Sequence, residues 1–436
     1  MDDQRSRVNG WATLLEGSPI PLAMLRMVVP LVIVVSPELE IAPRLAASPE
    51  QLGYVPEGLG LLARAPLTFE TARVLQIVAY SSAATAALGF FSRTSMLVLT
   101  LSAGWLFSLS QRSGAVLHDM HLFWLTALLA ASPCGDAWSL DRWGRASPGP
   151  SLRYGVPLAF ARVLLGLVYL FPGIHKLRAS GLAWISAENV TAHMHAKWLQ
   201  YATIPLVRVD RAPALCTLGG AFTIAFELSF VALALASRKT RLVAIAAGLV
   251  FHFSTQALFF IPFMSLWACY VVLLDGRWLA KKIDGNVAPP MNEPMMKRTI
   301  VVGTTLVVLA LAQGARGKTQ AWPFACYPTF EHLQGPTIPD IAIDFTKTDG
   351  TVVRLTGRER RARSQAEWGR VFRLSGAYGD RPRDDLLRDH ARAVAASAGI
   401  AAADVASMRV YRVQVRTAPD AWSETPTGGV LLVRAE

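Results

Sequence analysis

The chain has 436 residues, of which 52% are hydrophobic and 17% are charged, and its mean hydropathy is +0.34. Soluble domains average about 25% charged residues, so this composition excludes an ordinary soluble protein and favours a membrane protein. Lys and Arg (43) outnumber Asp and Glu (31), but basic loops in a membrane protein set its orientation, so we expect no nucleic-acid binding.

The N-terminal stretch MDDQRSRVNGWATLLEGSPIP contains acidic residues and no apolar run before Leu22, which indicates no cleavable signal peptide. From Leu22 to Leu311, apolar runs long enough to cross a bilayer recur between short polar loops. We therefore predict about nine membrane-spanning helices. They are placed near residues 21–36, 72–91, 95–110, 117–133, 156–175, 212–236, 242–260, 262–275 and 299–313.

Two stretches need separate treatment. The apolar stretch 242–275 is too long for one crossing and contains Pro262, so it is predicted to form a helical hairpin. The segment 176–211 between two predicted spans is long enough to hold an interfacial or re-entrant helix.

Loop charges predict which side of the membrane each loop faces, because cytoplasmic loops collect Lys and Arg. Arg5 and Arg7 place the N-terminus in the cytoplasm, and an odd number of spans then places the C-terminus outside. The predicted cytoplasmic loops contain Arg93, then Arg142, Arg145 and Arg153, then Arg238, Lys239 and Arg241, then Arg277, Lys281, Lys282, Lys297 and Arg298.

Charged residues become frequent after Gln313. The stretch IAIDFTKTDGTVVRL alternates around Asp349-Gly350, which predicts a β-hairpin; helices are expected at 364–374 and 383–398, and strands at MRVYRVQVRT and GVLLVRAE. The predicted fold class is mainly α, a polytopic membrane helical bundle with a small extracytoplasmic α+β domain. The predicted parts are a cytoplasmic N-terminus (1–20), a transmembrane domain (21–315) and the α+β domain (316–436).

Ionisable side chains at membrane depth cost several kcal/mol unless they are paired or hydrated, so they are candidate functional residues. They are Arg26, Arg162, Lys176, Glu227 and His252, together with His118 and His121 at the start of the fourth span. Each also has a structural interpretation. Arg26 could extend to the headgroups, Lys176 could cap a helix end, His252 could be a packing residue, and Glu227 could pair with Arg162.

Taken together, these residues predict a polar pocket near the outer leaflet. Burial favours the neutral form of a lysine, so Lys176 could act there as a general base toward a weak acid delivered from the membrane. No metal site is expected. The eight histidines show no desaturase-like HxxxH array and no CxxCH haem motif, and the four cysteines (134, 216, 269 and 326) share no CxxC spacing.

Several of these segments resemble, in order, the horizontally transferred transmembrane (HTTM) family, which includes the vitamin K-dependent γ-glutamyl carboxylase, over roughly residues 20–282. The matching stretches are LAMLRMVVP, GFFSRTS, HDMHLFWL with the following serine-aliphatic-aspartate at 139–141, and FHFSTQALFFIPF. The fifth span matches best, through Arg162, Tyr169, Gly173, Lys176 and Leu177.

The resemblance implies that Lys176 deprotonates a reduced quinone, vitamin K hydroquinone or menaquinol, helped by His118 or His121. It implies reaction with O2 and CO2 and a peptide or protein substrate on the outer side. Arg26, Arg162, Tyr169, His175, Glu227 and His252 are then expected to line the quinol site. The chain also departs from the carboxylase. His175 stands where the carboxylase has a second lysine, and the C-terminal region is far shorter, which affects the recognition of a peptide substrate.

We thus expect an integral protein of a bacterial inner membrane that contacts lipid and quinol and resembles a carboxylase, which is a carbon-carbon lyase. The alternative is a non-catalytic protein of the same fold that binds a lipid or isoprenoid or supports the assembly of a partner. Replacement of Lys176 would abolish function in the first case and leave it largely intact in the second.

Overall fold

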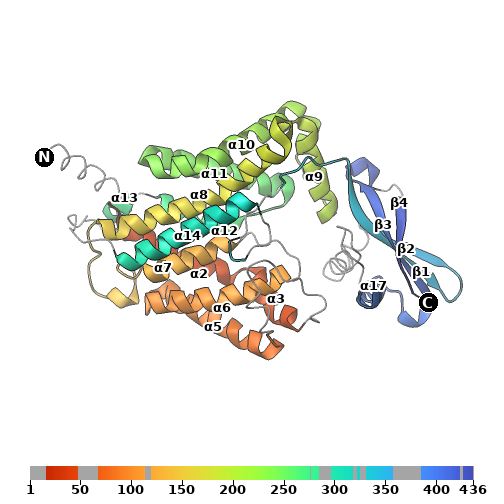
Figure 1. Cartoon of the computed structure of the whole chain (residues 1–436), viewed down its shortest axis with the longest axis horizontal. Coiled ribbons are helices and arrows are strands. Elements are labelled where there is room, and N and C mark those ends of the chain that lie inside the picture. The colour runs from red at the N-terminus through yellow and green to blue at the C-terminus, as the bar shows by residue number, and fades with distance from the viewer. Residues whose placement is uncertain are drawn as a thin grey trace. The chain divides into compact units, whose positions relative to one another are not determined.

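The computed structural model describes residues 16–47, 67–112, 119–274, 276–283, 296–317, 322–324, 330–356, 384–422 and 426–435. They form mainly helices and one small antiparallel sheet (Figure 1). The chain divides into two compact units. The first unit contains Met1–Ala179, Thr223–Phe253 and Pro262–Glu331, and the second contains Ser180–Phe222, Ser254–Ile261 and His332–Glu436.

The first unit is helical. Its elements are α2 (Ile20–Val34), α3 (Pro37–Ala46), α5 (Phe69–Leu88), α6 (Ser92–Arg112), α7 (Met120–Ala131), η2 (Leu140–Arg142), α8 (Leu152–Ser180), α12 (Met264–Trp267), η5 (Ala268–Leu273), α13 (Gly276–Ile283), α14 (Lys297–Arg316) and parts of α10 (Pro213–Ala236) and α11 (Arg238–Phe259). Within this unit α5 packs on α2, α3 and α6, and α7 packs on α2, α6 and α14 (Figure 1).

Helix ends follow local sequence signals. Helix α5 begins after Thr68, whose side chain accepts a hydrogen bond from the backbone N–H of Thr71. It ends at Gly89, which adopts the left-handed conformation (φ 73°) that glycine reaches without a steric penalty. Helix α11 begins after Ser237, which exchanges hydrogen bonds with Thr240. These ends are therefore encoded in the sequence next to them.

Four helical segments among the described residues are long and apolar enough to cross a membrane: Leu152–Ile185, Pro213–Ala236, Arg238–Phe259 and Lys297–Arg316. Helices α2 and α3, bent by 45° at the break between them, would make a fifth if they form one span. The chain is therefore an integral membrane protein with four or five candidate spans.

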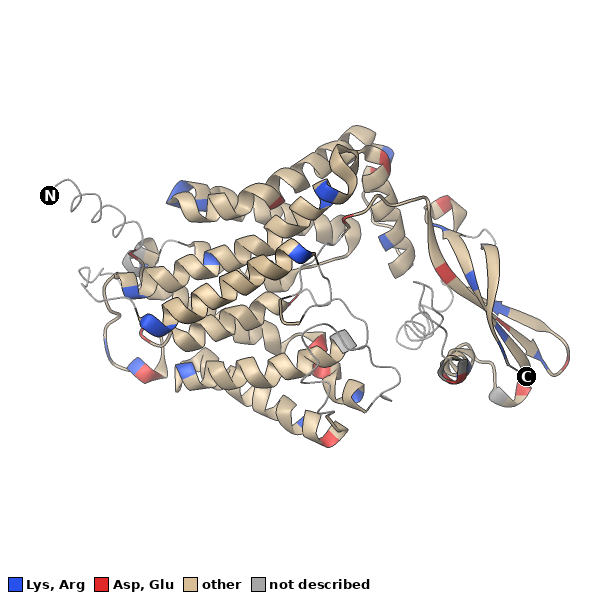
Figure 2. Cartoon of the chain, in the orientation of Figure 1, with Lys and Arg blue, Asp and Glu red and all other residues tan. Residues whose placement is uncertain are grey.

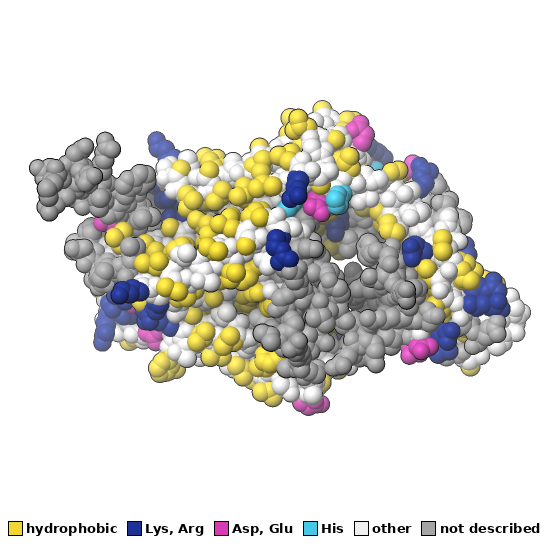
Figure 3. Space-filling model, viewed as in Figure 1, with side chains coloured by type: hydrophobic (Ala, Val, Ile, Leu, Met, Phe, Trp, Pro, Cys, Tyr) yellow, Lys and Arg dark blue, Asp and Glu magenta, His cyan; other side chains and the backbone are white. Residues whose placement is uncertain are grey.

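The surface of these helices is suited to lipid. Lys, Arg, Asp and Glu lie mostly near helix ends in Figure 2, and the helix surfaces in Figure 3 are largely hydrophobic. Many large apolar side chains on α10, α11 and α14 are exposed, where a soluble protein would bury them. They include Leu215, Leu218, Leu242, Val243, Val250, Phe253, Val301 and Val308.

The predicted count of nine spans is not confirmed. Helix α7 has 12 residues, a length of about 18 Å, which is shorter than the roughly 30 Å hydrocarbon core. Helices α5 and α6 are longer, but their Ser, Thr, Gln and Arg residues lower their hydropathy. The predicted break near Pro262 is present, because α11 ends at Phe259; the second arm of the hairpin is only the short segment Met264–Leu273.

The second unit combines helices with the sheet. Its helices include η3 (Gly181–Ile185), α9 (Ala187–Tyr201), η4 (Val209–Arg211) and α17 (Asp384–Ser397), along with η6 (Ala402–Asp404) and η7 (Pro419–Ala421). Helix α9 occupies the segment where an interfacial or re-entrant helix was expected.

The sheet has the strand order β2-β1-β3-β4, and all its pairs are antiparallel. Its strands are β1 (Thr337–Lys347), β2 (Val352–Leu355), β3 (Val405–Arg416) and β4 (Thr427–Ala435). The hairpin at Asp349-Gly350 is confirmed, with Gly350 at φ 85°. Helix α17 lies at the predicted position and beside β4, whereas the helix predicted at 364–374 lies outside the described residues.

Candidate functional site

A buried ion pair joins two of the candidate spans. The Lys176 Nζ of α8 donates to both carboxylate oxygens of Glu227 on α10, at 2.7 and 2.9 Å. Lys176 is 3% exposed and Glu227 is 4% exposed. A Cβ on Gly173 would lie 3.0 Å from the Glu227 Cβ, so glycine allows α10 to approach α8 closely at this level.

A second polar group lies on the same unit. The Tyr169 hydroxyl is 2.7 Å from the Nε2 of His252 and 2.8 Å from the Tyr270 hydroxyl. The His252 Nε2 and the Tyr270 hydroxyl are 3.2 Å apart. Tyr169 comes from α8, His252 from α11 and Tyr270 from η5. All three residues are buried. We call these three residues the hydroxyl-imidazole triad.

The triad and the ion pair belong to one buried cluster. Tyr169 lies two helical turns before Lys176 on α8 and close enough to Glu227 to interact with it electrostatically. Aromatic rings surround the triad: Phe230 is 4.5 Å and Phe226 is 5.1 Å from the Tyr169 ring, measured between centroids. The cluster therefore combines a cation, an anion, two phenols and an imidazole within an apolar shell.

His121 lies beside this cluster. Its Nε2 is 3.0 Å from the Ser265 carbonyl oxygen, and it interacts electrostatically with His252. The other histidine considered for the same role, His118, lies outside the described residues.

Tyr270 was not predicted as a site residue. A single tyrosine within the apolar run ACYVVL looks like a packing residue, and only its contacts with Tyr169 and His252 identify it.

Two other predicted site residues point elsewhere. The structural alternative that Glu227 pairs with Arg162 is wrong: Glu227 pairs with Lys176, and the Arg162 Nε donates to the Val272 carbonyl oxygen at 3.1 Å. His175 is buried next to Lys176 in sequence, but its Nε2 lies 2.8 Å from the Gly314 carbonyl oxygen of α14. Successive residues differ by about 100° around a helix, so His175 and Lys176 contact different neighbours.

Comparison with known families gives one match, to the HTTM domain, over residues 58–278. This range is half of the chain and contains every residue of the buried cluster. The chain belongs to the HTTM domain family. No curated protein and no solved structure matches the chain.

Within the HTTM domain, the serine-aliphatic-aspartate sequence at 139–141 has a structural role. The Asp141 carboxylate accepts hydrogen bonds from the backbone N–H groups of Phe91 and Ser92, at 2.8 Å each, and from the Ser92 hydroxyl at 2.7 Å. These groups lie at the start of α6, where N–H groups have no partner within the helix. Burial opposes the charge of Asp141, but these hydrogen bonds outweigh it and keep its pKa below the usual range.

Arg26 of α2 lies near Asp141. It is fully buried, so the alternative that it extends to the lipid headgroups is wrong. Its Nη2 donates to the Trp138 carbonyl oxygen, and the guanidinium lies against Gly89 and interacts with Asp141. These contacts tie α2 to the α5–α6 turn and to the 136–142 loop, which indicates a structural role.

Among the described residues, no group of three or more His, Cys, Asp or Glu side chains is arranged to hold a metal ion.

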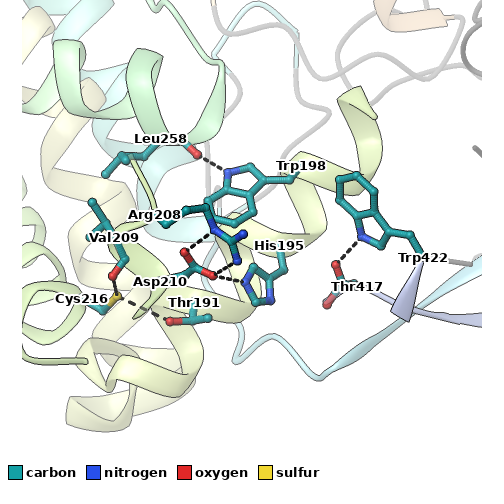
Figure 4. A network of polar contacts seen from close by, with 10 residues as sticks. All are labelled: Thr191, His195, Trp198, Arg208, Val209, Asp210, Cys216, Leu258, Thr417 and Trp422. Atoms are coloured by element: carbon teal, nitrogen blue, oxygen red, sulfur yellow. Dashed lines mark hydrogen bonds and ion pairs between the residues drawn. The ribbon is translucent and has the colours of Figure 1, made fainter. Parts of the chain in front are cut away.

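The second unit contains a separate polar network (Figure 4). Asp210 in η4 accepts hydrogen bonds from the Nε and Nη2 of Arg208, at 2.9 and 2.7 Å, and from the Nε2 of His195 at 3.1 Å. Arg208 also lies over the Trp198 ring. We call this network the Asp210 clamp.

The Asp210 clamp predicts a dependence of stability on pH. Hydrogen bonds from Arg208, with a smaller contribution from His195, lower the pKa of Asp210 to about 2, although burial opposes this shift. An unfolded aspartate has a pKa of about 3.9, so the clamp stabilises the protein above about pH 4 and loses this effect as the pH falls through about 2. Asp210→Asn should therefore lower the thermal midpoint at pH 7 and pH 5, and the difference from the unsubstituted protein should shrink near pH 3.

The control for this measurement is Asp385→Asn. The Asp385 side chain is 97% exposed, so the midpoint should hardly change. A difference between Asp210→Asn and the unsubstituted protein that stays constant down to pH 2 would contradict the assignment to Asp210.

Proposed function

We propose that this HTTM-family protein is a membrane enzyme that acts on a lipid-soluble quinol, in a reaction like that of the vitamin K-dependent carboxylase, with Lys176 as the base. The observation that carries the proposal is the buried ion pair between Lys176 and Glu227, because ionisable side chains at membrane depth are costly even when paired and are commonly functional.

The pair gives the lysine a route to its basic form. In a medium of low dielectric constant, transfer of the proton from the Lys176 ammonium to the Glu227 carboxylate removes two charges that lack solvation by water. The product is a neutral amine next to a neutral carboxylic acid. Lys176 could then accept a proton from a weakly acidic hydroxyl group, and Glu227 would hold the proton that Lys176 gave up.

The chemistry of the surrounding side chains fits a quinol. Phe226 and Phe230 are aromatic, like the head group of a quinol, and Tyr169 and His252 carry groups that can hydrogen-bond to a phenolic oxygen. A bound quinol would supply a weakly acidic hydroxyl and the reducing power for reaction with O2. We further propose an inner-membrane location, a cytoplasmic N-terminus, CO2 as co-substrate and a peptide or protein substrate on the outer side.

A non-catalytic protein that binds a lipid or isoprenoid, or supports assembly of a partner, is the second candidate. One observation favours it: Lys176 and Glu227 satisfy each other at short distances, which is also what a purely structural pair between two spans requires.

Quinol turnover in nanodiscs separates the two candidates. The protein is supplied with menahydroquinone or vitamin K hydroquinone, and the epoxide is followed by chromatography. Lys176→Met should lower the rate by about 10²- to 10⁴-fold, the usual contribution of a general base. Lys197→Met is the control, because Lys197 lies on α9 and bonds to Gln200.

Each result points to one candidate. Epoxide formation that depends on Lys176 and not on Lys197 supports the enzyme. No epoxide from folded protein that binds quinol would support the non-catalytic protein. Epoxide formed at a rate unchanged by Lys176→Met would contradict the assignment of Lys176 as the base.

A further inference from the structure

The loop between α9 and α10 exposes large apolar side chains. Ile204 is 40% exposed, Val207 is 67% exposed and Leu206 is fully exposed, whereas Pro205 between them is buried. We call residues 204–207 the apolar loop. Three exposed large apolar side chains within four residues mark a surface that has an apolar partner.

The apolar loop is held at both ends. On its N-terminal side, α9 ends at Ala202 in the left-handed conformation (φ 49°), and the Thr203 N–H donates to the Trp198 carbonyl oxygen at 3.0 Å. On its C-terminal side, the Asp210 clamp fixes Arg208 and Asp210 against His195 of α9 (Figure 4). The loop is therefore anchored at both ends, and the side chains of Ile204, Leu206 and Val207 remain exposed.

The chain from the apolar loop leads directly into a candidate span. Residues 208–212 separate the loop from α10, which begins at Pro213. Helix α10 has 24 residues, a length of about 36 Å, which is longer than a hydrocarbon core of about 30 Å. Leu215 and Leu218 on the first turns of α10 are exposed apolar residues like those of the loop.

The residues beside the apolar loop are those that favour the membrane interface. Tyr201 is exposed just before the loop and Arg211 is exposed just after it. Tyrosine is enriched at the level of the headgroups, and arginine is attracted to anionic lipids. An apolar tip flanked by an aromatic and a basic residue is the pattern expected where a chain enters the headgroup layer.

We propose that the apolar loop inserts into the lipid interface next to the N-terminal end of α10 and thereby anchors α9 at the membrane surface. The occupant of this surface is the bilayer itself and not a second protein. The inference is independent of the proposed quinol chemistry, since it concerns the second unit and requires no activity.

Site-directed spin labelling in nanodiscs tests the proposal. Cys134, Cys216 and Cys269 are buried, and Cys326, which lies outside the described residues, is replaced by serine in every variant. A nitroxide is attached to Leu206→Cys, and its collision rates with O2, which concentrates in lipid, and with a water-soluble nickel complex are compared. Leu218→Cys on α10 is the lipid reference, and Thr348→Cys in the β1–β2 turn is the water reference.

The proposal expects the Leu206→Cys label to collide more often with O2 than with the nickel complex, as at Leu218→Cys. Asp210→Asn in the same protein should reduce this preference, because the loop is then less firmly held. A preference for the nickel complex, as at Thr348→Cys, would overturn the proposal. Low collision rates with both reagents would also overturn it, because they would place the loop against protein, such as a second copy of the chain.

Discussion

Glu227→Leu is expected to lower the free energy of unfolding by about 3–5 kcal/mol, because it leaves the Lys176 ammonium buried without its carboxylate. Lys176→Met should lower the free energy of unfolding by a similar amount, because it leaves the Glu227 carboxylate buried without the ammonium group. The double variant Lys176→Met/Glu227→Leu should be far more stable than the sum of the single changes predicts, since both buried charges are gone. The free energy of unfolding of the unsubstituted protein, the two single variants and the double variant is measured by titration with SDS in mixed micelles.

The control for this cycle is an exposed pair. Arg392 lies 3.6 Å from Asp389 on α17, and both side chains are more than half exposed, so Arg392→Met should cost at most about 1 kcal/mol. Additive effects of the two substitutions at Lys176 and Glu227 would show that the two residues do not interact. The cycle also bears on function, because a stabilised double variant without quinol turnover separates loss of chemistry from loss of fold.

Gly248→Ala is expected to disrupt the hydroxyl-imidazole triad. A Cβ at this position would overlap the Tyr270 hydroxyl and lie 2.6 Å from the Tyr270 Cζ atom, so the ring must shift and its contacts with Tyr169 and His252 should change. Tyr270 is buried and stacks on Phe230, which leaves the ring little room. We expect a loss of about 1–3 kcal/mol in unfolding free energy, as in other overpacked cores, and a large loss of quinol turnover.

The matched control is Gly219→Ala in α10. No heavy atom lies within 4 Å of the position that a Cβ would take there, so the change should be neutral or slightly stabilising. Adding Tyr270→Phe to Gly248→Ala should restore part of the stability, because the overlapping hydroxyl is then absent, but not the turnover. Wild-type stability of Gly248→Ala would show that the ring can move freely and that the triad is not rigid.

Much of the candidate site was predictable residue by residue. Lys176, Glu227 and His252 are conspicuous because an ionisable side chain in an apolar run is rare and costly. Tyr169 was expected only from the resemblance to the HTTM family. Tyr270 could not be found in this way, since a tyrosine fits an apolar run without cost. The Asp210 clamp could not be predicted from the sequence either, because its residues lie in a polar segment, where charged side chains are common.

The sequence by itself determined that the chain is a membrane protein, where its four long candidate spans and the Asp349-Gly350 hairpin lie, and which side chains carry charge into apolar segments. These properties depend on local composition and periodicity. Only the tertiary structure decided that Glu227 pairs with Lys176 and not with Arg162, and that Arg26 is buried against the Trp138 carbonyl. The physical reason is that the partner of a buried charge depends on which helix faces meet, and apolar periodicity marks a buried face without naming its neighbour.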